Sequence, residues 1–195
     1  MRSSVFTTIM RNNTVKKLNN KKGVTLIELL VTVVLLVLVT GIITLAIDLG
    51  VRSFKKSNRE AEGQILCAAL ATSVKDELRY AKNITGTDLS TLKFFSTNLS
   101  LKNCSFSITD QDGIPVAENE SGFLMLSTPL GLYDLVPKKT YVYDLKANLT
   151  IEFELLDEDS DQPKPTFKVG IQVVAQEGTN EITISEENFV VEPLN

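Results

Sequence analysis

KKGVTLIELLVTVVLLVLVTGIITLAID, which occupies residues 21–48, is a nearly unbroken apolar run with charged residues at both ends. Glu28 is the only ionisable residue between positions 24 and 47. Twenty-four residues rise about 36 Å as an α-helix, and the hydrocarbon core of a bilayer is about 30 Å thick. A strand is excluded by length, because strands rarely exceed about ten residues. The run therefore predicts a membrane-spanning helix over residues 24–47.

Basic residues flank this predicted span on both sides. Residues 1–23 carry six of them and no acid: Arg2, Arg11, Lys16, Lys17, Lys21 and Lys22. Because Lys and Arg near a span favour the cytoplasmic side, we expect the N-terminus in the cytoplasm and the C-terminal part outside. Four more basic residues lie just past the far end of the span and weigh against this orientation: Arg52, Lys55, Lys56 and Arg59.

Composition argues against several classes of function. The chain has no histidine, so a Ser-His-Asp or Cys-His catalytic set is impossible and the commonest metal ligand is missing. Two cysteines alone cannot form a structural zinc site, and no Gly-rich loop ending in Gly-Lys-Ser/Thr marks an ATP site. Residues after Ile84 hold 7 basic and 18 acidic side chains, which repel nucleic-acid phosphates. We therefore expect no enzyme, no cofactor, no bound metal and no direct contact with nucleic acid.

A processing signal precedes the apolar run. Residues 21–30, KKGVTLIELL, combine a basic leader, a glycine, an apolar run and one glutamate at a fixed offset. This combination resembles the class III signal of type IV pilins and of secretion and competence pseudopilins. The resemblance implies that a prepilin peptidase cuts after Gly23 and that the new first residue, Val24, is N-methylated. That family usually has Phe where this chain has Val24, and a leader of 23 residues is long for it.

Glu28 needs an explanation, because a carboxylate inside a bilayer costs about 2.5–3.5 kcal/mol on insertion scales. One interpretation is that its side chain lies near enough to the surface to reach water. The other depends on cleavage, which creates an α-ammonium group on Val24 that is charged at neutral pH. Pairing of that group with Glu28 of a neighbouring subunit would neutralise both charges and fix the axial register of assembly. The resemblance implies the same role.

Helical periodicity continues beyond the predicted span. No proline occurs between residues 24 and 83, and apolar residues recur at steps of three or four from Ala61 to Ala81. We therefore expect one helix, from 24 to about 82, that is apolar all round in its first half and amphipathic in its second. A membrane span followed by a separate soluble helix is the alternative. Three glycines fall inside this helix, and ordinary tolerance explains them: Gly41, Gly50 and Gly63.

From Ile84 the pattern becomes that of short alternating strands between turns. The candidate strands are 92–96, 104–109, 123–127, 140–145, 148–156, 166–175 and 181–192. They predict one antiparallel sheet with one wet face, packed on the apolar stripe of the helix. The predicted fold class is α+β. It has three parts, namely a cleaved leader (1–23), a long helix (24–83) and a β-rich extracytoplasmic head (84–195).

Two features of the head have competing interpretations. Cys67 on the helix and Cys104 at a strand start could form a disulfide worth about 3–4 kcal/mol, or could be two unpaired core thiols. The acidic run at 157–161, DEDSD, suggests a calcium loop, but Gln162 replaces the turn glycine and Lys168 the closing glutamate. A solvated acidic loop is the preferred interpretation.

The leading hypothesis is a structural subunit, of minor abundance, in a type IV pilus-like or pseudopilus filament that becomes extracellular. The resemblance implies these partners: a prepilin peptidase, other pilin or pseudopilin subunits, membrane lipid, an assembly platform protein and a cytoplasmic ATPase. The alternatives are a tip-displayed binding or adhesion module and a competence or secretion pseudopilin. An enzyme is the weakest hypothesis. Without histidine, a catalytic site in the head would need a pair of carboxylates, and the spacing of the acidic residues does not indicate which two could form such a pair.

Overall fold

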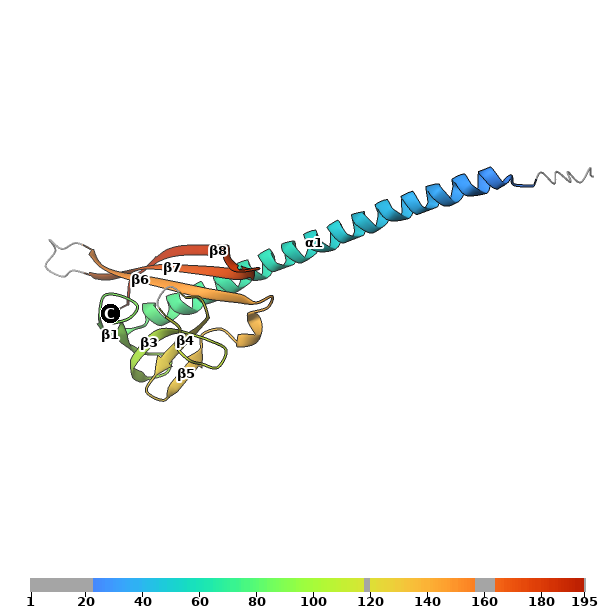
Figure 1. Ribbon diagram of the computed structural model, residues 1–195. Helices are drawn as coiled ribbons and strands as arrows, with labels where there is room; N and C mark the ends of the chain where they lie inside the picture. The colour runs from blue at the N-terminus through green and yellow to red at the C-terminus, as the bar shows by residue number, and fades with distance from the viewer. Residues whose placement is uncertain (1–22, 118–119, 157–163, 195) are drawn as a thin grey trace, which may run out of the picture. The chain divides into compact units, whose positions relative to one another are not determined.

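The computed structural model describes residues 23–117, 120–156 and 164–194. Figure 1 shows the elements in chain order: α1 (Leu26–Arg79), β1 (Lys82–Thr85), β2 (Lys93–Ser96), β3 (Leu101–Thr109), β4 (Phe123–Thr128), β5 (Gly131–Asp134), the short 3-10 helix η1 (Lys138–Thr140), β6 (Leu145–Leu156), β7 (Lys164–Glu177) and β8 (Asn180–Val191). The chain divides between Leu49 and Gly50 into two units, and α1 contributes to both. The α+β class is confirmed.

In the first unit, α1 is apolar on every side. The large apolar side chains between Val24 and Leu49 are 48–83% exposed. This surface is unfavourable in water, at about 25 cal/mol per Å² of apolar area. The helix is long and apolar enough to cross a membrane, and the span predicted at 24–47 lies almost wholly within it.

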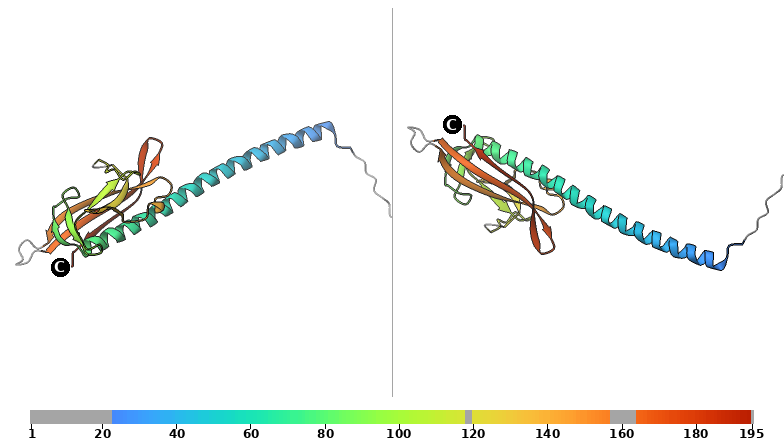
Figure 2. Two further views of the ribbon diagram at one scale, coloured as in Figure 1. Left: turned by 90° about the horizontal axis from the view of Figure 1, so that it is seen from below. Right: turned by 90° about the horizontal axis from the view of Figure 1, so that it is seen from above.

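The second unit has two antiparallel sheets, and the C-terminal half of α1 packs against both (Figures 1 and 2). One sheet has the order β1-β2-β3-β4-β5 and the other β6-β7-β8. β6 pairs with β7 from Leu145 opposite Ala175 to Leu156 opposite Lys164. β8 pairs along the other side of β7, as far as Val191 opposite Phe167. β7 is therefore the central strand of its sheet.

The prediction of a single sheet is wrong. Only two isolated bridges join the two sheets within the described ranges, Gly122 to Ala147 and Asp88 to Glu152. The predicted strand at 140–145 is also absent, because the chain there forms η1 and then a loop. Tyr143 and Asp144 both adopt a φ of 56° in this loop, a left-handed conformation that interrupts extended backbone. The loop separates β5 from β6 and divides the sheet.

Two other differences concern short elements and the ends of the helix. β1 and β5 were not predicted, since each has four residues and shows no clear alternation of burial. The helix runs from Leu26 to Arg79 rather than from 24 to about 82. The long strands β6, β7 and β8 agree with the predicted ranges 148–156, 166–175 and 181–192 to within three residues at each end.

The core joins one face of α1 to both sheets. Leu66, Leu70, Val74 and Leu78 are fully buried and recur at steps of four, the spacing of one helix face. Their apolar cluster includes residues of both sheets: Phe94, Phe106, Leu124, Leu126, Phe167, Ile171 and Val173. Full burial of one such side chain is worth about 1.5–3 kcal/mol, so this helix face is the main link between the two sheets.

A buried acid on α1 holds the turn between β2 and β3. The Glu77 carboxylate accepts hydrogen bonds from Ser96 Oγ at 2.9 Å and from Asn98 Nδ2 at 2.8 Å. Ser96 Oγ in turn accepts from the backbone N–H of Leu99 at 3.2 Å. Both carboxylate oxygens are therefore satisfied by neutral donors, and the turn is fastened to the last turns of the helix.

The glycines of α1 provide a first prediction. A Cβ atom on Gly63 would collide with Ile184 Cγ2 and lie 3.2 Å from Ile184 Cβ, whereas nothing lies within 4 Å of such an atom on Gly50. We predict that Gly63→Ala destabilises the second unit by about 1–3 kcal/mol, because Ile184 is branched at Cβ and cannot turn aside. Gly50→Ala should stabilise the helix by about 1 kcal/mol. Thermal unfolding of both variants in detergent measures the contrast, which is contradicted if both shift in the same direction.

The Glu77 cluster provides a second prediction. Glu77→Ala should lower the free energy of unfolding by about 1–3 kcal/mol, because the hydroxyl of the fully buried Ser96 loses its acceptor. Asp76→Ala is the matched control, since Asp76 is the exposed neighbour on the same helix. Urea unfolding followed by circular dichroism gives both values. Equal effects of the two substitutions would refute the assigned role of Glu77.

Candidate functional site

The candidate site is the segment from Gly23 to Glu28 at the start of α1, and Thr25 fixes its local structure. The Glu28 N–H donates a hydrogen bond to Thr25 Oγ1 at 3.3 Å, and the Leu29 N–H donates to the Thr25 carbonyl at 3.1 Å. Thr25 is thus the N-cap, and Thr-x-x-Glu is the pattern of a capping box. The predicted helix start at Val24 missed this pattern, although it is visible in the sequence.

The predicted cleavage bond lies in exposed backbone before the helix. Gly23, Val24 and Thr25 belong to no regular element, and Val24 is 67% exposed. Nothing lies within 4 Å of where a Cβ atom on Gly23 would be. A protease that binds extended backbone closely would meet no obstruction from the described residues at this bond.

Glu28 lies in the first turn of α1, where unpaired backbone N–H groups and the helix dipole favour a negative charge. Its side chain is exposed, as are all its neighbours in the first unit. Among the residues that the structure describes, none offers the Glu28 carboxylate an ion pair or a hydrogen bond. The charge therefore has no neutralising partner in this part of its own chain.

The hydroxyl groups in the apolar run, in contrast, are satisfied locally. Thr32 Oγ1 donates to the carbonyls of Glu28 at 3.0 Å and Leu29 at 2.8 Å. Thr40 Oγ1 donates to the Leu36 carbonyl at 2.8 Å, and Thr44 Oγ1 to the Thr40 carbonyl at 2.9 Å. Such bonds to the preceding turn let threonine enter hydrocarbon without an unpaired donor. Glu28 is thus the polar side chain of residues 24–47 that the helix does not satisfy by itself.

Cys67 and Cys104, the candidates for a disulfide, are separate buried thiols in the structure. Cys67 Sγ donates to the Ile171 carbonyl at 3.8 Å, and Cys104 Sγ to the Leu101 carbonyl at 3.4 Å. Burial raises the pKa of both thiols above the ordinary value of 9.0. Both are therefore protonated at neutral pH, and neither has the thiolate character of a reactive cysteine.

Two carboxylates of the head lie on the wall of one cavity. A cavity of about 540 Å³, lined mainly by residues of β3 and β6, has Asp88 and Glu152 on its wall. However, Asp88 already accepts hydrogen bonds from Ser90 Oγ at 2.8 Å and Thr91 Oγ1 at 2.7 Å. These hydrogen bonds lower the pKa of Asp88, and the bond from Thr91 has the larger effect. The Asp88 carboxylate therefore serves as an acceptor that stabilises the loop in which it lies.

The structure offers no assembled metal site in the part of the chain that it describes. No group of three or more His, Cys, Asp or Glu residues is placed there to hold an ion. The acidic run at 157–161, for which a calcium loop was weighed, lies outside the described residues.

Comparison with known proteins points to the same N-terminal segment. The family model of the prokaryotic N-terminal methylation motif matches residues 18–44. No curated protein and no solved structure matches the chain. The matched range includes the Gly23–Val24 bond, the Thr25 cap, Glu28 and most of the apolar run. A motif of this type implies processing by a prepilin peptidase and assembly with other pilin subunits. Together with the long helix packed on antiparallel sheets, the match supports the resemblance of the chain to type IV pilin-like proteins.

Proposed function

We propose that this chain is a minor structural subunit of a type IV pilus-like or pseudopilus filament. Residues 24–47 anchor it in the membrane, with the N-terminus in the cytoplasm and the head outside. A prepilin peptidase cuts between Gly23 and Val24, and Val24 is then methylated. A platform protein and a cytoplasmic ATPase extract the subunit, which ends in an extracellular filament. The role is structural rather than catalytic.

One observation carries this proposal, namely that Glu28 is an acid without a partner in the first turn of a helix that is apolar on every side. When the helix moves from lipid into a bundle of like helices, apolar contacts alone give little drive, because lipid tails are as apolar as leucine. Pairing of Glu28 with the Val24 ammonium of a neighbouring subunit would favour association of the two helices and would fix their axial register. Opposite charges attract far more strongly in a low-dielectric bundle than in water.

A second candidate, a binding module displayed at a filament tip, is favoured by the β4–β5 hairpin. Leu130 is 73% exposed, and Leu132 and Tyr133 are 38% and 39% exposed. Exposed apolar side chains gathered on one hairpin suit a partner surface. Abundance separates the candidates, because a subunit within the shaft recurs along purified filaments whereas a tip subunit is scarce.

Processing is tested on the N-terminus of the mature chain. When the chain is expressed with a prepilin peptidase, mass spectrometry should find Val24 as the first residue, and the mass of that peptide reports methylation. Gly23→Leu should block cleavage, because a side chain would stand where the protease approaches the backbone. Filaments that contain the chain with Met1 and its leader intact would refute the proposal.

Assembly is tested by removing the unpaired charge. Glu28→Leu should still insert, since insertion becomes easier by about 2.5–3.5 kcal/mol, but it should fail to co-assemble. Thr32→Val is the control on the same helix face, because the Thr32 hydroxyl bonds only within its own helix. Immunoblots of membrane and filament fractions measure both steps. Normal incorporation of Glu28→Leu into filaments would exclude the pairing.

A further inference from the structure

The residues just past the apolar part of α1 form what we call the basic stripe: Arg52, Lys55, Lys56 and Arg59. Their spacing of three, four and seven residues places all four on one face of the helix. The surrounding residues, 48–62, contain three acids: Asp48, Glu60 and Glu62.

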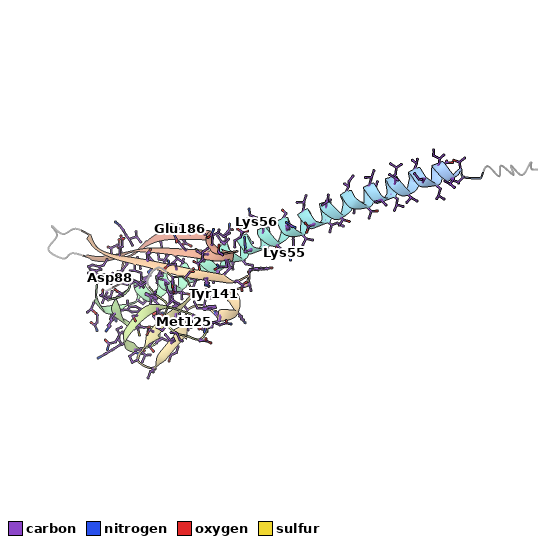
Figure 3. The ribbon with its side chains drawn as sticks, viewed as in Figure 1. Lys55, Lys56, Asp88, Met125, Tyr141 and Glu186 are labelled. Carbon is purple, nitrogen blue, oxygen red and sulfur yellow. The ribbon has the colours of Figure 1, made fainter. Side chains whose placement is uncertain are left out.

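Much of this positive charge faces solvent. Lys56 Nζ lies 3.9 Å from Glu60 Oε1, but the two side chains are 72% and 49% exposed, and an exposed pair of this kind is weak. Lys55 is exposed, and no ion pair links it to a described residue. Figure 3 labels Lys55 and Lys56 on this part of α1. Arg59 differs, because its side chain is only 19% exposed and its Nη2 lies 3.7 Å from Glu177 Oε1.

The basic stripe is costly in the proposed orientation. Lys and Arg next to a span favour the cytoplasmic side, yet these residues follow the span on the side assigned to the exterior. An anion that is present on the outer side wherever the chain is anchored would offset that cost. The headgroups of the bilayer itself meet this requirement.

We infer that the basic stripe binds the phosphate of an anionic phospholipid in the outer leaflet and holds α1 there before assembly. The inference rests on the proposed function, since it requires residues 24–47 to lie in a bilayer. Lys55 and Lys56 carry the binding, and Arg59 is largely neutralised by Glu177.

The distances along the helix allow this contact. The predicted span ends at Ile47. Arg52 lies five residues beyond Ile47, or about 7.5 Å along the helix axis, and Lys55 and Lys56 lie roughly 12–13.5 Å beyond it. The headgroup layer is roughly 5–7 Å thick on each side of the hydrocarbon core. Side chains on an α-helix lean toward its N-terminus, which is the direction of the membrane here. Long lysine side chains can therefore place their ammonium groups among the phosphates.

The acidic head of a neighbouring subunit is the competing partner. β8 carries Glu181, Glu186 and Glu187 and no Lys or Arg. The lipid is favoured because the stripe directly follows the membrane segment in the chain, whereas contact with a neighbouring head requires assembly first. The attraction of basic residues beside a span to an anionic membrane surface grows with their number.

The test uses a single fluorophore, since the chain has no tryptophan. Phe54 lies within the same turns as the stripe and is 66% exposed, so Phe54→Trp reports on lipid next to it. The mature full-length chain is placed in bilayers of equal parts phosphatidylcholine and phosphatidylglycerol, with a nitroxide near the glycerol of one lipid or the other. Labelled phosphatidylglycerol should quench severalfold more strongly, and high salt should remove the difference.

The matched variants decide between the outcomes. Lys55→Gln with Lys56→Gln should bring the two quenching constants to equality. Lys93→Gln with Lys102→Gln removes the same charge from exposed strand positions and should keep the preference. Equal quenching in the parent chain, or a preference that survives in the Lys55/Lys56 variant, would overturn the inference. The parent chain could also show no lipid preference while its Lys55/Lys56 variant fails to co-assemble. That result would assign the basic stripe to the head of a neighbouring subunit and would also overturn the inference. Absence of quenching by either lipid would instead refute the membrane anchoring in the proposed function.

Discussion

Apolar side chains surround α1 from Val24 to Leu49, and no described part of the chain covers them. Such a surface is stable only in hydrocarbon or among similar helices. Hydrocarbon in turn demands that polar groups be satisfied within the helix. Thr25 caps the first turn and the hydroxyls of Thr32, Thr40 and Thr44 bond to the preceding turns. Glu28 is the exception, because its carboxylate has no partner among the described residues.

In the head, the C-terminal part of α1 forms part of a hydrophobic core. There its apolar side chains lie on one face, with Leu66, Leu70, Val74 and Leu78 buried between it and the sheets. Gly63 lets the helix approach β8, and Glu77 fastens the turn between β2 and β3. A head without residues 63–79 would lose the centre of its core. The sheets alone are therefore not a complete head, because residues 63–79 of α1 supply the centre of its core.

The sequence predicted the fold well where a hydrophobic pattern extends over many residues. Apolar length predicted the span, and alternation predicted β6, β7 and β8 to within a few residues. The division into two sheets was not predictable in this way, since it depends on left-handed backbone at Tyr143 and Asp144, and neither position has the glycine that would mark such a turn in the sequence. The role of Gly63 was missed because it depends on Ile184, which is distant in sequence. At the candidate site, the N-cap at Thr25 could have been predicted from the sequence, because Thr25 and Glu28 have the spacing of a capping box. Cleavage after Gly23, methylation of Val24 and pairing of Glu28 stay predictions, because each involves a second molecule.

The last residues of the chain complete the head. β8 supplies Ile184 against Gly63, and the Leu194 N–H donates to the Arg79 carbonyl at 2.8 Å. A polypeptide leaves the ribosome with α1 first and β8 last. The head thus cannot close until β8 and the residues up to Leu194 have been synthesised. Throughout that interval Leu66, Leu70, Val74 and Leu78 lack the cover that the finished head gives them, so an incomplete chain exposes the apolar centre of its own core.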